Sequence, residues 1–250
     1  MLTILEKPSL KNPILVEGLP GIGLVGKLAG DHLLDELKAT KFAEIHSPFL
    51  PPQVNIKEDG TIKLVNMEFH RWADGAKELI LLTGEFQGIT PDSQYQLAEK
   101  TLNLAAELNV KRMYTLGGLA TGNITSHPKV FGAATSRELV DEHKKYNITF
   151  KGDGAIFGAS GLLLGLGVQQ GIEGVCLMGE THGQIIDAKS AQAVLTTLTN
   201  ILGITVDMTA IEKKARDTER QMTQISKMLS DHQREAERRE DSSDATNYIR

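Results

Sequence analysis

The chain has 250 residues, of which 40% are hydrophobic and 24% are charged, with 24 glycines and 8 prolines. This composition supplies enough apolar surface for a sizeable core and excludes disordered, collagen-like and disulfide-stapled proteins. The net charge of −5 argues against a protein that binds nucleic acid through its phosphates. The single cysteine, Cys176, lies in an apolar run and is expected to be a buried strand residue. The N-terminal residues lack a signal-peptide pattern, so we expect a soluble protein of a reducing compartment.

The first half of the chain alternates between extended and helical patterns. Apolar residues recur at helical spacing after residue 24, and Thr90 with Pro91 supplies a helix cap and a first-turn proline. The expected elements are a strand over 13–17, a glycine cluster over 18–26, a helix over 24–38, a strand over 42–46, a hairpin of 53–57 and 61–65, a strand over 78–83 and a helix over 91–108.

The second half repeats this alternation. The expected elements are a strand over 111–116, a helix over 135–145, an extended segment over 147–150, a helix over 160–170, a strand over 175–178 and a helix over 188–202. Short apolar strands separated by helices predict a three-layer α/β/α domain over residues 1–206 with a mostly parallel sheet. The hairpin is expected to be its one antiparallel addition.

Residues 154–172 resemble a membrane span, because 19 consecutive residues carry no charge. Six of them are glycine, however, so the apolar content is modest for a helix within a bilayer. We interpret the stretch as a glycine-rich loop followed by a buried helix, and expect no membrane association.

Beyond residue 206 the pattern changes to a long amphipathic helix over 207–240 and a flexible tail over 241–250. Apolar residues follow a three–four spacing among largely charged neighbours, so the helix either packs on the domain or pairs with another chain. The apolar positions are Met208, Ile211, Ala215, Met222, Ile225 and Leu229.

The glycine cluster admits two interpretations. Gly21, Gly23 and Gly26 fit the G-x-G-x-x-G spacing of a dinucleotide-binding turn, and Glu44 lies 18 residues beyond Gly26, near where an acid would bind a ribose. Together with Gly18 these residues form a possible ligand loop of a nucleotide- or dinucleotide-binding enzyme. Alternatively, the glycines only let a helix pack closely on the sheet.

Other signals for catalysis are weak. Glu180 and His182 follow a strand, as catalytic residues of α/β proteins do, but a pair of residues that orders a loop by hydrogen bonds explains them as well. The seven histidines are not spaced for a shared metal site, and no G-x-S-x-G motif is present. We therefore expect no catalytic residue, no metal and no cofactor.

The order of several motifs resembles the archaeal proteasome assembly chaperone family over residues 13–202. Each motif is loose, but the series is specific. The motifs are EGLPGIGLVG at 17–26, GEFQG at 84–88, TLGG at 115–118, PKVFGAAT at 128–135, GAIFGASGLL at 154–163 and GETHG at 179–183.

This resemblance implies a topology similar to nucleoside phosphorylases without their active site. It also implies a cytoplasmic homo-oligomer, not an enzyme, that helps proteasome α subunits to assemble. Chaperones of this family often end in a hydrophobic–tyrosine–any tripeptide that docks between α subunits. This chain ends in Tyr248, Ile249 and Arg250, so the tripeptide is present in altered order.

Overall fold

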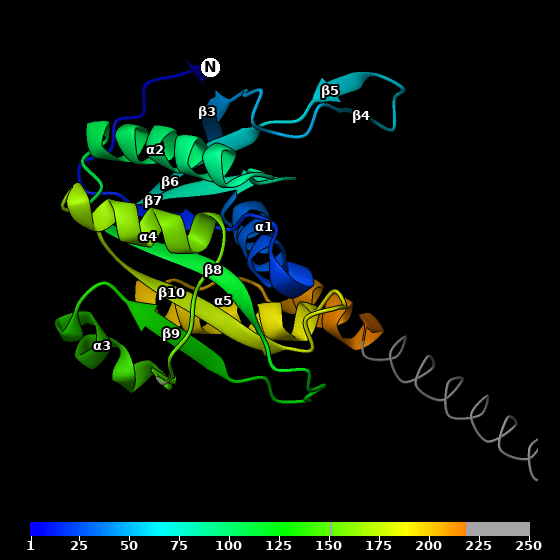
Figure 1. Cartoon of the computed structure of the whole chain (residues 1–250), viewed down its shortest axis with the longest axis vertical. Coiled ribbons are helices and arrows are strands. Elements are labelled where there is room, and N and C mark those ends of the chain that lie inside the picture. Colours follow the sequence, from blue (N-terminus) through cyan, green and yellow to red (C-terminus); the bar gives the residue numbers. More distant parts are fainter. Residues whose placement is uncertain (151, 219–250) are drawn as a thin grey trace, which may run out of the picture.

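The computed structural model describes residues 1–150 and 152–218. Within these residues, an eight-stranded sheet lies between two layers of helices, and a two-stranded hairpin projects from one end (Figure 1). The helices are η1 (Ile22–Leu24), α1 (Val25–Leu37), α2 (Pro91–Glu107), α3 (Arg137–His143), η2 (Lys144–Tyr146), α4 (Ala159–Gln169) and α5 (Ala188–Leu202). Residues 209–218 are also helical.

The sheet has the order β1-β3-β6-β7-β2-β8-β10-β9. The second, two-stranded sheet is the hairpin of β4 and β5. The strands are β1 (Leu2–Ile4), β2 (Ile14–Glu17), β3 (Thr40–Ile45), β4 (Val54–Ile56), β5 (Ile62–Leu64), β6 (Met67–Asp74), β7 (Lys77–Gly84), β8 (Arg112–Ala120), β9 (Val130–Ala134) and β10 (Glu173–Thr181).

The four central strands, β7, β2, β8 and β10, are parallel. This confirms the predicted α/β class with helices on both faces of a parallel sheet centre. The prediction that the hairpin is the one antiparallel addition is wrong. Strands β1, β3 and β6 join one side of the centre in antiparallel pairs, and β9 joins the other side.

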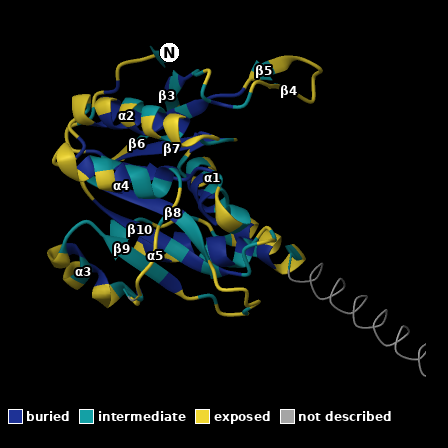
Figure 2. Ribbon diagram, in the orientation of Figure 1, coloured by how far each residue is buried: buried dark blue, intermediate teal, exposed yellow. Residues whose placement is uncertain are grey.

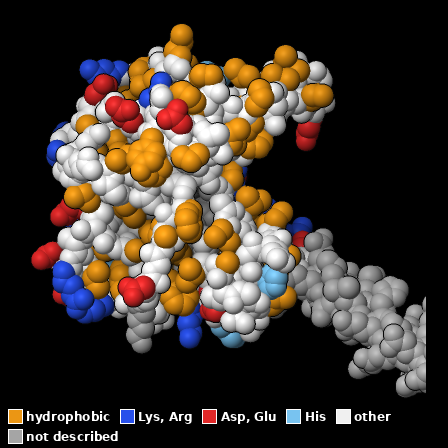
Figure 3. Space-filling model, in the orientation of Figure 1, with side chains coloured by type: hydrophobic (Ala, Val, Ile, Leu, Met, Phe, Trp, Pro, Cys, Tyr) orange, Lys and Arg blue, Asp and Glu red, His pale blue; other side chains and the backbone are white. Residues whose placement is uncertain are grey.

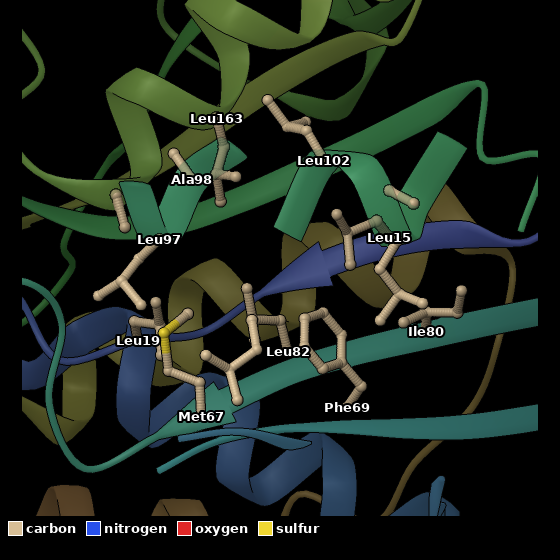
Figure 4. Packing of buried hydrophobic residues seen from close by; sticks show 14 of the residues in the cluster. Leu15, Leu19, Met67, Phe69, Ile80, Leu82, Leu97, Ala98, Leu102 and Leu163 are labelled. Atoms are coloured by element: carbon tan, nitrogen blue, oxygen red, sulfur yellow. The ribbon is translucent and has the colours of Figure 1, made fainter. Parts of the chain in front are cut away.

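The alternation of side chains along the central strands builds one core on each face of the sheet. Leu15 of β2 packs under α2 and α4, whereas the next residue, Val16, packs under α1 and α5. In β7, Ile80 and Leu81 divide between the faces in the same way, because successive strand residues point in opposite directions. Figure 4 shows the first core, with leucines of α2 lying over the sheet, and Figure 2 shows the buried sheet between the two layers.

The predicted helices begin where their capping residues lie. Thr90 and Ser93 form a capping box at the start of α2, and Asp187 accepts a hydrogen bond from the Ser190 N–H at the start of α5. Helix α4 begins within the uncharged stretch, as predicted. None of the helices in the described residues is long and apolar enough to cross a membrane.

Three strands were not predicted, and one predicted segment is not a strand. The unpredicted strands are β1, β6 and β9. β6 carries charged residues, and β9 is rich in glycine and alanine, which have low β propensity. The predicted extended segment over 147–150 makes a single bridge, between Thr149 and Phe131.

Candidate functional site

The loops at the carboxyl ends of the parallel strands lie on one edge of the sheet, where α/β proteins usually place their sites. The glycine cluster of 18–26 follows β2, and a glycine-rich segment precedes α4. The GEFQG and GETHG motifs span the ends of β7 and β10, and TLGG lies within β8. Most of the quoted motifs therefore meet at this edge, although they are far apart in the sequence.

Two glycines of the cluster over 18–26 are sites of close backbone packing. A Cβ atom on Gly26 would lie 2.1 Å from the carbonyl oxygen of Leu116 in β8. One on Gly18 would lie 2.8 Å from the Cα atom of Gly30 in α1. Helix α1 therefore approaches the sheet at a distance that only glycine allows.

The other two glycines behave differently from each other. Gly23 has a φ angle of 63°, and a Cβ atom there would lie 2.9 Å from Oγ1 of Thr181, so the η1 turn rests on the end of β10. Gly21 has nothing within 4 Å of a Cβ position. The structure thus gives three of the four glycines a steric or conformational role, which supports the packing interpretation of the cluster.

Glu44 does not lie beside this loop. Its strand, β3, is separated from β2 by β6 and β7. The carboxylate accepts hydrogen bonds from Lys41 at 3.0 Å and from Asn66 at 3.0 Å, and lies 3.1 Å from Nε2 of His46. Burial raises the pKa of Glu44, but the bonds from Lys41 and His46 outweigh it and hold the pKa below its usual value. The structure therefore does not bring Glu44 and the glycines together.

A buried carboxylate that sequence analysis missed lies at the end of β2. Glu17 is 1% exposed, and it accepts a hydrogen bond from the Leu19 N–H at 2.9 Å and one from the Ser160 hydroxyl at 2.8 Å. Burial raises the pKa of Glu17 to about 7, against the lowering effect of these hydrogen bonds. The sequence feature that could have indicated this buried carboxylate is an acidic residue directly after the apolar run of a central strand.

Gln87 completes the connection between the motif loops. Its side-chain amide donates to the carbonyl of Pro20 at 2.7 Å, and its carbonyl oxygen accepts from the Ala159 N–H at 2.9 Å. The second bond caps α4, whose N-cap residue, Gly158, has no side chain to do so. The hydrogen bonds of Glu17 and Gln87 together hold the start of α4 against the loop after β2.

Glu180 serves as a loop-ordering residue. Its carboxylate lies 3.4 Å from both the Thr121 hydroxyl and the Lys129 N–H, which belong to the segment between β8 and β9. His182 faces a small cavity that Ala215 and Thr218 also line. Within residues 1–150 and 152–218 no cluster of three or more histidine, cysteine or acidic side chains is placed to hold a metal ion. Cys176 is buried, as predicted.

The first turns of the predicted C-terminal helix pack on the domain. Ile211 is 1% exposed and Ala215 is 4% exposed, and Ile211 belongs to the core between the sheet and helices α1 and α5. Met208 is half-buried against the same core, and Nε2 of His32 lies 2.6 Å from the carbonyl oxygen of Asp207. The other residues predicted for the helix and for the tail lie outside the described residues; they are Met222, Ile225, Leu229, Tyr248, Ile249 and Arg250.

Comparison with known proteins identifies relatives over nearly the whole chain. The model of the PAC2 family matches residues 15–226. The crystal structure of PbaB from Pyrococcus furiosus, described as an archaeal proteasome activator, shares 39% identity with a TM-score of 0.87, covering 90% of this chain and 98% of PbaB. PbaA of the same organism, described as an archaeal homolog of proteasome-assembly chaperone, shares 26% identity with a TM-score of 0.76, covering 99% of both chains.

A sequence relative shows a similar span. The uncharacterized protein MJ1210 of Methanocaldococcus jannaschii is 40% identical over 241 residues, which cover 96% of this chain and 93% of the relative. The family match, the identity and the structural likeness all extend across the sheet and its motif loops. This chain is a member of the PAC2 family.

Proposed function

We propose that this protein is a proteasome assembly chaperone or activator that acts by binding proteasome α subunits, without catalysing a reaction. The observation that carries the proposal is the likeness to PbaB, because it joins 39% identity to a TM-score of 0.87 over 98% of that chain. The likeness to PbaA points to the same process. We place the protein in the cytoplasm as part of this proposal.

The geometry of the sheet edge supports binding rather than chemistry. Three of the four glycines have a steric or conformational role, Glu44 is held by its own neighbours, and Glu17 is buried beneath the start of α4. A nucleotide-dependent enzyme would need the loop after β2 and an acid to face one ligand. The described residues do not provide that arrangement.

The proposal divides the chain into the α/β domain of residues 1–206, the helix of 207–240 and the tail of 241–250. We infer that the helix braces a homo-oligomer and that the tail reaches the proteasome. A docking tail needs an apolar anchor, an aromatic hydroxyl and a free carboxylate. Tyr248, Ile249 and the terminal Arg250 supply these groups in an order that differs from that of the family tripeptide.

The test is binding of the purified full chain to recombinant archaeal proteasome α subunits, compared with a chain that lacks residues 248–250. Asn247→Ala is the matched control, because it changes a neighbouring residue and keeps the tripeptide. We expect the truncated chain to lose binding and the control to keep it. Binding that survives truncation would move the contact to the folded domain, and no binding by any form would refute the proposal.

Stimulation of peptide hydrolysis distinguishes the two proposed roles. An activator increases peptide hydrolysis by the assembled proteasome core, whereas an assembly chaperone increases the yield of cores from separate subunits. Both quantities are measurable with the same purified components. A protein that binds but changes neither would be a proteasome ligand without either role.

A further inference from the structure

A groove of about 660 Å³ lies between α4 and the end of the sheet that β9 forms. Phe131 and Ala133 of β9 and Met178 of β10 line its sheet side, and residues 152–156 complete the lining. Helices α3 and α5 pack against β9 on the opposite face. On the groove side, Phe131 and Ala133 border open space instead. Figure 3 shows hydrophobic side chains on this side of the molecule, between α4 and the two strands.

Helix α4 turns an apolar side toward the groove as well as toward the core. The groove side is formed by four residues at a spacing of three and four, which share one side of the helix; they are Gly161, Leu164, Gly165 and Val168. None of residues 159–169 is charged, and Val168 is 52% exposed. A helix that is apolar on every side is normally buried. The composition of α4 therefore suits a helix with neighbours on both sides.

Gly165 has no steric reason to be glycine within the described part of the chain. A Cβ atom there would meet nothing within 4 Å, although glycine weakens the interior of a helix. Gly161 differs, because a Cβ atom on it would lie 2.2 Å from the carbonyl oxygen of Ile156. Glycine also lets a second backbone approach closely. The open position at Gly165 is therefore suited to a helix that packs against α4 from outside this chain.

The composition and size of the groove favour a permanent contact between identical chains. Of the 16 residues that line it, Asp153 is the one that is charged, whereas 24% of the whole chain is charged. Contacts between identical subunits are more apolar than transient contacts and are depleted in charge. A standard interface uses roughly 20 to 30 residues on each side. The groove reaches this size together with exposed residues at the two ends of α4, such as Phe157 and Gln169.

We propose that α4 of a second copy of this chain packs along the groove side of α4, so that each copy covers the groove of the other. The helix that lacks an outer neighbour and the groove that lacks a cover adjoin in one molecule. A single two-fold axis near Gly165 therefore satisfies both copies at once. At the crossing the two glycines let the helix backbones approach closely, and Val168 of each copy enters the groove of the other. The inference rests on the homo-oligomer of the proposed function and assigns a surface to it.

Cross-linking through a single introduced thiol tests the contact directly. The native Cys176 is fully buried, and burial raises its pKa to about 12, so it does not compete for the reagent. Val168→Cys places a thiol beside the proposed axis, and a short bis-maleimide is expected to link two copies. Ile89→Cys, at a position 68% exposed before α2, is the control. Equal yields of dimer from the two variants, or no dimer from Val168→Cys, would overturn the proposal.

Two charge substitutions on α4 provide the second measurement. Val168→Asp places a carboxylate in the groove, whereas Gln169→Asp places one at the next position, which is exposed and does not line the groove. We expect Val168→Asp to raise the dissociation constant of the dimer more than about tenfold in sedimentation equilibrium, because an unpaired charge is buried. The control should match the native chain. An unchanged constant for Val168→Asp, or a native chain that is monomeric at every concentration, would contradict the proposal.

Gly165→Ala separates the contact from the stability of the single chain. The new Cβ atom meets nothing within the described chain, and alanine favours a helix, so unfolding below the dissociation constant should be native or harder while the dimer weakens. An undiminished dimer would show that no helix approaches Gly165 and overturn the proposal. Loss of α-subunit binding by Val168→Asp at unchanged mass would assign the groove to that partner and overturn it too. Failure of the native chain to bind α subunits refutes only the proteasome function, since cross-linking and sedimentation need no proteasome.

Discussion

The Ser160 hydroxyl donates a hydrogen bond of 2.8 Å to the buried carboxylate of Glu17, across 143 positions of sequence. This bond joins the end of the central strand β2 to the first turn of α4, the helix that follows the uncharged glycine-rich loop. Since the partners lie in two of the family motifs, the pairing gives a physical reason for both motifs. It also places an acid with a raised pKa in the centre of the fold.

Stability should fall as the pH rises from about 4.5 to about 7 and then level off, because of Glu17. The pKa of this group is about 7 in the folded protein against 4.5 for the free side chain. Below pH 4.5 the carboxyl is protonated in both the folded and the unfolded state, so it does not change the free energy of unfolding. Between pH 4.5 and 7 the unfolded chain loses the proton while the folded protein keeps it, and this difference lowers the free energy of unfolding. Through this group, the free energy of unfolding should decrease by about 3 kcal/mol between the two limits. Glu17→Gln should remove this decline in urea unfolding measured from pH 5 to 8, and should be the more stable protein at pH 8.

Glu44→Gln serves as the control of opposite sign. The pKa of Glu44 is lowered in the folded protein, so its charged form stabilises the fold above the unfolded pKa, and this contribution is lost as the pH falls. The variant should be less stable than the native chain at pH 8 and should keep the native slope between pH 6 and 8. If Glu17→Gln showed that same slope, Glu17 would not be the titrating group.

The sequence contained enough information for the helices and the parallel sheet centre, because these depend on local periodicity and capping. The start of α2 at Thr90–Pro91 and the bounds of α5 follow from such signals. The contact between Glu17 and Ser160 could not be predicted, since it depends on which strands become neighbours. The orientation of the hairpin could not be predicted for the same reason. The alternation of apolar and polar residues along its strands shows that one face is apolar, but it does not show which face meets the domain.

Two glycines of the G-x-G-x-x-G pattern, Gly26 and Gly21, should respond differently to substitution by alanine. Gly26→Ala sets a Cβ atom 2.1 Å from a backbone oxygen that cannot move aside, so α1 must shift from the sheet. We expect a loss of about 3 kcal/mol, at the upper end of typical overpacking costs. Gly21→Ala meets nothing within 4 Å and should stay within about 0.5 kcal/mol of the native chain in the same unfolding assay. Comparable losses at both positions would contradict the packing role.

The packing role of the loop also predicts the outcome of a ligand screen. ATP, NAD and NADP at millimolar concentration should leave the melting temperature of the native chain unchanged. A ligand present at a hundred times its dissociation constant would add about 2.7 kcal/mol to the free energy of unfolding. A shift that Gly21→Ala abolishes would revive the nucleotide-binding hypothesis, because that substitution leaves the packing untouched.

Ile211 should behave as a core residue of the domain rather than as a contact between copies. The side chain is 1% exposed within one chain and packs in the core beneath α1 and α5. Ile211→Ala should therefore lower the free energy of unfolding by about 2 to 4 kcal/mol, through lost burial and the cavity left behind. Ile186→Ala, at a position 54% exposed, is the control and should cost less than about 0.5 kcal/mol. A variant at Ile211 with native stability and a reduced mass in solution would show instead that this turn of the helix holds two copies together.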